Sequence, residues 1–296
     1  MHARPVTALA GPVLEPCQLG EGATWSEARG ALLWTDIQGK RMWSFEPASG
    51  RSQSWALPAR LGSFALTRDA NRLLAAFEHH IAWLDLTTGD SQVLARFEDG
   101  LTTRANDGRC DRAGNFIFGT LDEVRRGAPA GRWYRYSAGG ELRPLDLPPL
   151  YIPNGLAFSP DGGRIYFADS TERAVHCADY NAATGGLRHV RMFVQLDEGE
   201  PDGATVDAEG HYWSAQWGAG RLQRYAPSGE LSGQVLLDAS QPSCPAFGGP
   251  DLATLFTTTA SQGLDAQALA AQPNAGRVFS AATPWRGLAE PLFGGA

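Results

Sequence analysis

Residues 154–169 read Asn154-Gly-Leu-Ala-Phe-Ser-Pro-Asp161, then two glycines, then Arg164-Ile-Tyr-Phe-Ala-Asp169. A polar start, an apolar run, a turn and a second apolar run are typical of two paired β-strands. The same order of residue types occurs at Glu21-Gly-Ala-Thr-Trp-Ser-Glu-Ala28, which is followed by Leu32-Leu-Trp-Thr-Asp36. The chain therefore contains an internal repeat.

Six copies of this unit can be aligned along the chain. The residues at the position of Asn154 are, in chain order, Glu21, Leu61, Asn106, Asn154, Asp202 and Cys244. Their spacings are 40, 45, 48, 48 and 42 residues. Repeats of about 40 to 50 residues, each with four short strand patterns, are typical of β-propellers. The sequence predicts an all-β fold, a six-bladed β-propeller with four-stranded blades, formed by residues 1–296 as a single domain.

The second strand of each unit gives the clearest local signal, because it is a run of apolar and aromatic β-forming residues. These strands are expected at 32–37, 72–77, 115–120, 164–168, 211–215 and 255–259. Helical periodicity is confined to the Ala- and Leu-rich stretch 262–272, where a short helix is expected. The 35 glycines and 19 prolines are spread evenly, so no linker divides the chain.

Composition excludes several classes of function. The chain has 296 residues, 25 basic and 32 acidic, with a net charge of −7 and no block of Lys and Arg. This argues against a nucleic-acid partner and against binding to an anionic membrane surface. The four cysteines lie far apart without a CxxC pair, and no signal peptide or transmembrane-length run is evident. We expect a cytoplasmic protein; the oligomeric state stays open, and a monomer is compatible with the sequence.

The matched polar residues predict a binding site. In a propeller the first strand of each blade lines the central axis, so Glu21, Asn106, Asn154 and Asp202 should converge at one mouth of the channel. Carboxylate and amide oxygens without His or Cys suit Mg, Ca or Mn, while Fe(II) and Zn stay open as alternatives. Three protein ligands would leave positions for water and substrate.

The alternative reading of these residues is structural. Asn-Gly and Asp-Gly are common hairpin turns, and Asn154-Gly155 or Asp202-Gly203 taken alone would be read as turns. Glu21 has weak turn propensity and yet occupies the same place in its repeat. The shared register therefore favours the binding site. The tryptophans, which include Trp25, Trp34, Trp43, Trp213 and Trp217, fall on repeat positions and are expected to pack between blades.

Several motifs together resemble one known family. They are Leu19-Gly-Glu-Gly22 with Trp25, Arg104-Ala-Asn-Asp-Gly108, Gly119-Thr120, Pro153-Asn-Gly155, Ser159-Pro-Asp161, Pro201-Asp-Gly203 and Phe247-Gly-Gly249. In order and spacing they resemble the SMP-30/gluconolactonase/regucalcin family, and its bacterial sugar lactonases in particular. The match spans nearly the whole chain.

The resemblance implies a six-bladed propeller that holds one divalent metal through Glu21, Asn154 and Asp202. It also implies that Arg104 and Asn106 contact a sugar lactone. The family often has Pro where Ala23 stands here. An acidic substrate-binding residue of some family members falls near 122–124. Counting places Val124 there, and the neighbouring acids Asp122 and Glu123 are the candidates for that role.

These observations predict hydrolysis of an aldonolactone to the aldonic acid. The metal would polarise the lactone carbonyl, and Asp202 would act both as a ligand and as the general base for the attacking water. Two other readings remain. One is a non-catalytic propeller that binds calcium or a partner through the same ring, and the other is a different metal-dependent esterase activity. The sequence leaves the metal and the sugar open.

Overall fold

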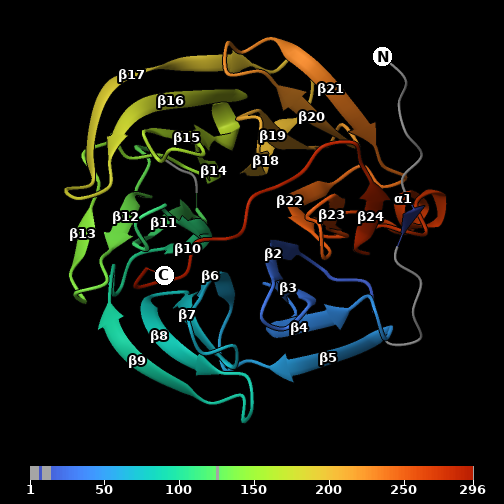
Figure 1. Cartoon of the computed structure of the whole chain (residues 1–296), viewed down its shortest axis with the longest axis horizontal. Helices are drawn as coiled ribbons and strands as arrows, with labels where there is room; N and C mark the ends of the chain where they lie inside the picture. Colours follow the sequence, from blue (N-terminus) through green and yellow to red (C-terminus); the bar gives the residue numbers. More distant parts are fainter. Residues whose placement is uncertain (1–6, 9–14, 125–126, 296) are drawn as a thin grey trace.

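The structure, a computed structural model, describes residues 7–8, 15–124 and 127–295. Six antiparallel sheets of four strands each surround a central axis (Figure 1). The predicted all-β, six-bladed propeller is confirmed. In each blade the first strand lies nearest the axis and the fourth at the rim.

The first five blades follow the chain in order. Blade 1 is β2 (Gly20–Ser26), β3 (Ala31–Asp36), β4 (Arg41–Glu46) and β5 (Arg51–Ala56). Blade 2 is β6 (Leu61–Leu66), β7 (Arg72–Phe77), β8 (His80–Asp85) and β9 (Ser91–Arg96). Blade 3 is β10 (Thr103–Cys110), β11 (Phe116–Asp122), β12 (Trp133–Tyr136) and β13 (Leu142–Pro144). Blade 4 is β14 (Pro153–Phe158), β15 (Arg164–Asp169), β16 (Ala174–Asn181) and β17 (Gly186–Gln195). Blade 5 is β18 (Glu200–Val206), β19 (Tyr212–Trp217), β20 (Arg221–Tyr225) and β21 (Leu231–Leu236).

Blade 6 joins the two ends of the chain. It contains β22 (Pro242–Gly248), β23 (Thr254–Thr259) and β24 (Phe279–Ala282), and its outer strand is β1 (Thr7–Ala8) from the N-terminal segment. Thr7 pairs with Ser280 and Ala8 with Phe279. This antiparallel pairing ties the start of the chain to its last blade, a feature that the repeat alignment did not predict.

Aromatic side chains fill the interfaces between blades, as expected. Trp25 stacks on Phe256 of the neighbouring blade, with ring centroids 5.8 Å apart. Trp213 meets Phe247 of blade 6 edge-on at 5.7 Å. Aromatic rings combine a large apolar area with preferred pairing geometries, so these contacts hold adjacent blades in register. Trp217 differs, because it is only partly buried and faces a cavity.

The few helical segments are short. The expected helix is α1 (Ala266–Ala271), whose first turn is capped by the Asp265 carboxylate. A single 3₁₀ turn, η1 (Ser170–Glu172), follows β15. In the described part of the chain no helix has the length and apolarity needed to cross a membrane.

A C-terminal tail closes one end of the channel. After β24 the chain crosses the axis as an extended segment (Figure 1), and Phe293 N donates to Leu66 O while Gly294 N donates to Gly114 O. Glu290 in this tail pairs with Arg109 of β10, and both side chains are largely buried. The tail contacts the ends of the first strands. The starts of those strands therefore form the open mouth.

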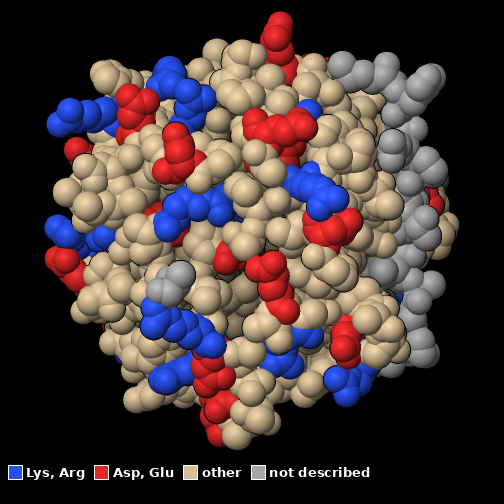
Figure 2. All heavy atoms as spheres, in the orientation of Figure 1, with Lys and Arg blue, Asp and Glu red and all other residues tan. Residues whose placement is uncertain are grey.

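Acidic and basic side chains are intermingled on the face shown in Figure 2. This distribution agrees with a net charge of −7 that is not gathered into one block.

Candidate metal and substrate site

The first strand of every blade contains a register shift next to the matched position. The shifts lie between Glu21 and Thr24, Leu61 and Ser63, Ala105 and Gly108, Asn154 and Ala157, Pro201 and Ala204, and Pro242 and Pro245. Such bulges bend a strand locally and re-aim its side chains. Here they turn the side chains at the start of the strands toward the axis.

Glycine follows three of the four polar ring residues, and this geometry requires it. Gly22 and Gly155 have φ values of +63° and +69°, where a side chain is strained. At Gly203, whose φ is ordinary, a Cβ would lie 2.7 Å from Ser243 O. The pairs read as possible hairpin turns are therefore bulges inside first strands.

Two buried aspartates hold the segments that lead into the site. Asp36 accepts hydrogen bonds from the backbone N–H groups of Gln18 and Leu19, both at 3.0 Å. Asp169 accepts from Tyr151 N and Ile152 N at 2.7 and 3.2 Å. Both carboxylates therefore have a structural role. Each fixes the approach of the strand that carries Glu21 or Asn154.

The matched residues share one cavity of about 380 Å³ at the open mouth. Its lining includes Glu21, Arg104, Asn106, Glu123, Asn154, Ser170, Asp202, Trp217, Gln241 and Gln262. All four predicted ring residues are therefore brought together, although they come from four different blades. Asp122 is not in the lining.

The two ring carboxyl groups line the same cavity and interact electrostatically. Burial and the charge of Asp107 raise the pKa of Glu21 to about 8. Burial, followed by the charge of Glu21, raises the pKa of Asp202 well above its usual range. Two adjacent desolvated carboxylates repel each other unless a proton or a cation lies between them.

The amide of Asn154 completes an oxygen-only donor set. Its Nδ2 donates to Ser170 Oγ at 2.9 Å, and the Ser170 hydroxyl donates to Pro201 O at 2.7 Å. With the nitrogen held in this way, Oδ1 is the end of the amide that is available to a ligand. A carboxylate pair and one amide oxygen fit a hard divalent cation, whose charge the two carboxylates would neutralise.

Asn106 links the ring to Arg104. Its Nδ2 donates to Asn154 Oδ1 at 3.0 Å and to Pro153 O at 2.9 Å. Its Oδ1 accepts from Arg104 Nη1 at 2.8 Å. Arg104 is only 4% exposed, and burial lowers its pKa to about 10. A continuous chain of hydrogen bonds thus runs from Arg104 through Asn106 and Asn154 to Ser170.

The two acidic candidates at the end of β11, Asp122 and Glu123, have different surroundings. Glu123 lines the cavity, and its Oε1 lies 3.7 Å from Arg104 Nε. Its two carboxylate oxygens accept hydrogen bonds from Nη1 and Nη2 of Arg60 at 2.6 and 2.9 Å. The hydrogen bond and charge of Arg60 lower the pKa of Glu123. Asp122 accepts from Val124 N and Ala130 N at 3.1 and 3.3 Å, so its carboxylate holds the loop. The structure thus turns only Glu123 toward the cavity.

Comparisons with known proteins agree with this geometry. Residues 19–261 match the model of the SMP-30/gluconolactonase/LRE-like region. The chain belongs to this family. It is 42% identical to an L-arabinolactonase of Azospirillum brasilense over 280 residues, which cover 94% of this chain and 92% of that protein. It is 35% identical to a 6-deoxy-6-sulfogluconolactonase of Pseudomonas putida, covering 96% and 97% of the two chains.

A solved structure shows the same fold. The crystal structure of a calcium-binding protein, regucalcin, from Agrobacterium tumefaciens superimposes with a TM-score of 0.89 at 33% identity. The match covers 96% of this chain and 97% of that one. The resemblance found in the sequence motifs is confirmed.

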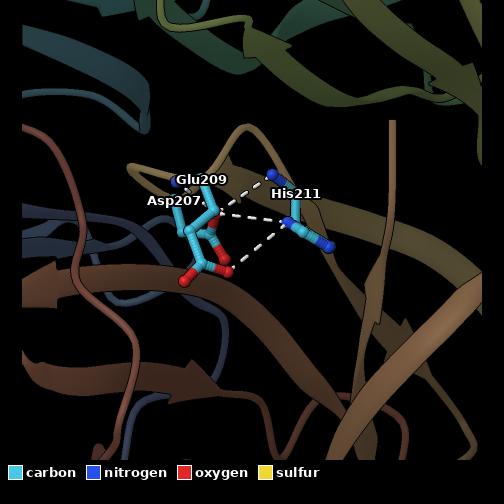
Figure 3. Close-up of side chains that lie close together, drawn as sticks. All are labelled: Asp207, Glu209 and His211. Carbon is cyan, nitrogen blue, oxygen red and sulfur yellow. Dashed lines mark hydrogen bonds and ion pairs between the residues drawn. The ribbon is translucent and has the colours of Figure 1, made fainter. Parts of the chain in front are cut away.

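This SMP-30/gluconolactonase/LRE-like chain has a second acidic cluster that is unsuited to a metal. Asp207, Glu209 and His211 approach one another in the turn between β18 and β19 (Figure 3). Arg224 Nε donates to Asp207 at 2.7 Å and its Nη2 to Glu209 at 2.5 Å. Asp207 also accepts the indole N–H of Trp213 at 3.0 Å. The guanidinium of Arg224 already neutralises these carboxylates, so the cluster stabilises blade 5.

Three cavity residues and one nearby acid were not predicted from the sequence of this family member. Ser170, Trp217 and Gln241 line the cavity, and none occupies the matched repeat position. Asp107 stands where the other ring strands have glycine, accepts from Leu156 N at 2.8 Å, and has a pKa raised by burial to about 6. The only available signal was that Asp107 breaks the glycine pattern of the repeat.

Proposed function

We propose that this protein hydrolyses a sugar lactone, an aldonolactone, to the corresponding aldonic acid. Membership of the family and the lactonase names of its relatives support this function. The observation that carries it is that one cavity is lined by the carboxyl groups of Glu21 and Asp202 together with Asn154 and Arg104. That arrangement combines a cation site with polar groups suited to a hydroxylated substrate.

Glu21, Asn154 and Asp202 would hold one divalent cation. The cation, when bound, supplies a Lewis acid that polarises the lactone carbonyl and stabilises negative charge on its oxygen. The donor set is hard, which favours Ca, Mg or Mn over Zn or Fe(II).

Asp202 would also move the proton. Its carboxylate accepts a proton from the attacking water as the water oxygen adds to the lactone carbonyl carbon. The ring C–O bond then breaks, and the same proton passes to the departing ring oxygen. The product is the open hydroxy acid, and Asp202 returns to its carboxylate form.

Arg104, Asn106 and Glu123 would orient the substrate. The Arg104 guanidinium carries a positive charge and cannot bind a cation, so its useful partners are hydroxyl or carbonyl oxygens. Its hydrogen bond to Asn106 and the nearby Glu123 hold it in one position. Orientation of this kind lowers the barrier by reducing the entropy lost in the transition state.

A pH-indicator assay tests the proposal. The protein is stripped with a chelator and assayed on several pentono- and hexonolactones, with each divalent metal added back separately. L-arabinolactone is the first substrate to test, because a relative that is 42% identical is named L-arabinolactonase. We expect turnover that disappears on chelation and returns with at least one metal. Full activity of the chelated protein would contradict the metal dependence, and no activity with any metal and lactone would contradict the function.

A second candidate function is a calcium-binding propeller without catalysis. The similarity to a calcium-binding regucalcin favours it, because the same oxygen ligands would hold the ion. Calorimetry decides between the two. Tight calcium binding by a protein that hydrolyses none of the lactones would favour the binding function.

A further inference from the structure

Gln241, which is not one of the four predicted ring residues, places an unpaired acceptor at the cavity. This residue lies directly before β22 of blade 6 and is 9% exposed. Its Nε2 donates to Gln262 O at 3.2 Å, which directs Oε1 away from that loop. Oε1 is buried, and within residues 7–8, 15–124 and 127–295 no group hydrogen-bonds it. Buried polar atoms are nearly always paired in native proteins, so this one calls for a partner.

Arg104 offers the complementary group on the other side of the mouth. Its Nε is buried and likewise makes no hydrogen bond with any described residue, although Glu123 lies 3.7 Å away. Blade 3 carries Arg104 and blade 6 carries Gln241, so the two stand opposite each other in a ring of six (Figure 1). Both residues line the same cavity.

The surroundings of Gln241 suit a sugar. Trp217 and Gln262 line the same cavity, and Trp217 packs on the apolar cluster of Leu19, Ile37 and Ala260. Pockets that bind small molecules combine apolar walls with a few placed polar groups. A hydroxyl group is the substrate group that can donate to Oε1 of Gln241.

We propose that Gln241 is a specificity residue that accepts a hydrogen bond from one hydroxyl of the substrate, on the side of the mouth opposite Arg104. This inference rests on the proposed lactonase function and names the part of the substrate that the site reads. A site built to pair with a hydroxyl discriminates strongly against an analogue that lacks it, because the buried group is then left unpaired.

The test combines protein variants with deoxy substrates. Gln241→Leu removes the acceptor and also the hydrogen bond to Gln262. Gln241→Glu keeps an oxygen acceptor but loses the hydrogen bond that Nε2 donates. Gln234→Leu, at a partly buried position of β21 outside the cavity lining, is the matched control. Each variant is assayed at saturating metal on an aldonolactone, on its singly deoxygenated analogues and on a lactone without ring hydroxyls, and metal affinity is measured separately.

We expect Gln241→Leu to lower kcat/KM for the aldonolactone by about tenfold to a hundredfold, with metal affinity unchanged. For one deoxy analogue, the one that lacks the partner hydroxyl, wild type and Gln241→Leu should react at equal rates, as in a double-mutant cycle. The decrease in kcat/KM should be smaller for Gln241→Glu than for Gln241→Leu. The control variant Gln234→Leu should keep the wild-type kcat/KM.

Two results would overturn the inference while leaving the lactonase function intact. One is an equal loss on every lactone, which would make Gln241 structural. The other is an equal defect in Gln241→Glu and Gln241→Leu, which would assign the effect to the Gln262 hydrogen bond. A wild-type protein that hydrolyses none of the lactones would instead contradict the proposed function itself.

Discussion

Asp202 carries two tasks in the proposed reaction, so its replacement is the most severe test of a single residue. Asp202→Asn keeps the size of the side chain but removes the proton acceptor and one of two neutralising charges. We expect kcat to fall by more than the roughly 10²- to 10⁴-fold typical of losing a general base alone. Steady-state kinetics measure the fall in kcat, and a parallel titration measures metal affinity. A variant with near-wild-type turnover would rule out this role.

Ser170 is expected to act on the metal through Asn154. Ser170→Ala removes the acceptor that holds Asn154 Nδ2, so the amide keeps only the hydrogen bond from Asn106 to fix its orientation. Mutation of a residue that hydrogen-bonds a metal ligand typically lowers metal affinity by about 10- to 100-fold. We expect Ser170→Ala to lower metal affinity within that range. Ser44→Ala, a buried serine of β4 outside the cavity lining, is the control. Equal metal affinity of Ser170→Ala, Ser44→Ala and wild type would contradict this role.

The raised pKa of Glu21 predicts how the metal-free protein responds to pH. The pKa is about 8 in the folded protein against 4.5 for an unperturbed glutamate, chiefly because the carboxyl is buried. Between these values the folded state binds more protons than the unfolded state. The free energy of unfolding should therefore fall as pH rises through this window, and level off above it. The pKa of Asp202 is also raised, so this residue likewise lowers the free energy of unfolding as pH rises.

Thermal unfolding from about pH 5 to about pH 9 measures this effect, with and without a divalent cation. The cation should stabilise the protein more as pH rises, because it replaces the shared proton. Glu21→Gln should weaken the pH dependence of the chelated protein. A Tm of chelated wild type that stays constant or rises across the window would be inconsistent with a buried carboxyl pair.

At the scale of the strand, the bulge explains why glycine follows the ring residues. Gly155 has a φ of +69°, and a Cβ there would lie 2.7 Å from Tyr212 Oη. Gly30 has a φ of +59° with no atom of the described chain within 4 Å of such a Cβ. Backbone strain is common to both positions, whereas steric conflict occurs only at the first.

We expect Gly30→Ala to cost roughly 1–2 kcal/mol of stability, the strain of a left-handed residue. Gly155→Ala should cost more and should also weaken metal binding, because Asn154 is its neighbour in the bulge. Denaturant unfolding and metal titration of both variants provide the comparison. If Gly155→Ala binds metal as wild type does, the bulge does not set the position of Asn154.

At the scale of the whole molecule, the tail and the site occupy opposite ends of one channel. Glu290 pairs with Arg109, with side chains 14% and 13% exposed. Glu290→Gln leaves the guanidinium without this partner and should cost about 1–3 kcal/mol of stability. Glu46→Gln removes an exposed ion pair to Arg51 and should cost less than about 1 kcal/mol. Urea unfolding measures both.

The same Glu290→Gln variant should keep the metal affinity and the KM of wild type, because the tail contacts the far ends of the first strands. A large change in either constant would show that the channel couples the tail to the site.

The sequence by itself determined the architecture and the position of the ring. Repeats of 40 to 48 residues with the same strand pattern specify equivalent blades, and equivalent positions in equivalent blades meet at the axis. The alignment of the repeats predicts the ring because it uses only the order of residues within each unit. The ring residues are Glu21, Asn106, Asn154 and Asp202. The short helix and the inter-blade tryptophans follow from local pattern in the same way.

Only the tertiary structure decided which atoms of these residues face the cavity and can bind a ligand. The Asn154 amide is oriented by Ser170, the loop after β11 turns Glu123 and not Asp122 toward the cavity, and β1 closes blade 6. Gln241 reaches the site from a position outside the repeat pattern. Each of these depends on contacts between side chains and loops that lie far apart in sequence, where the repeat carries no information. The hydrogen-bond partners of these side chains are set only when the blades pack together.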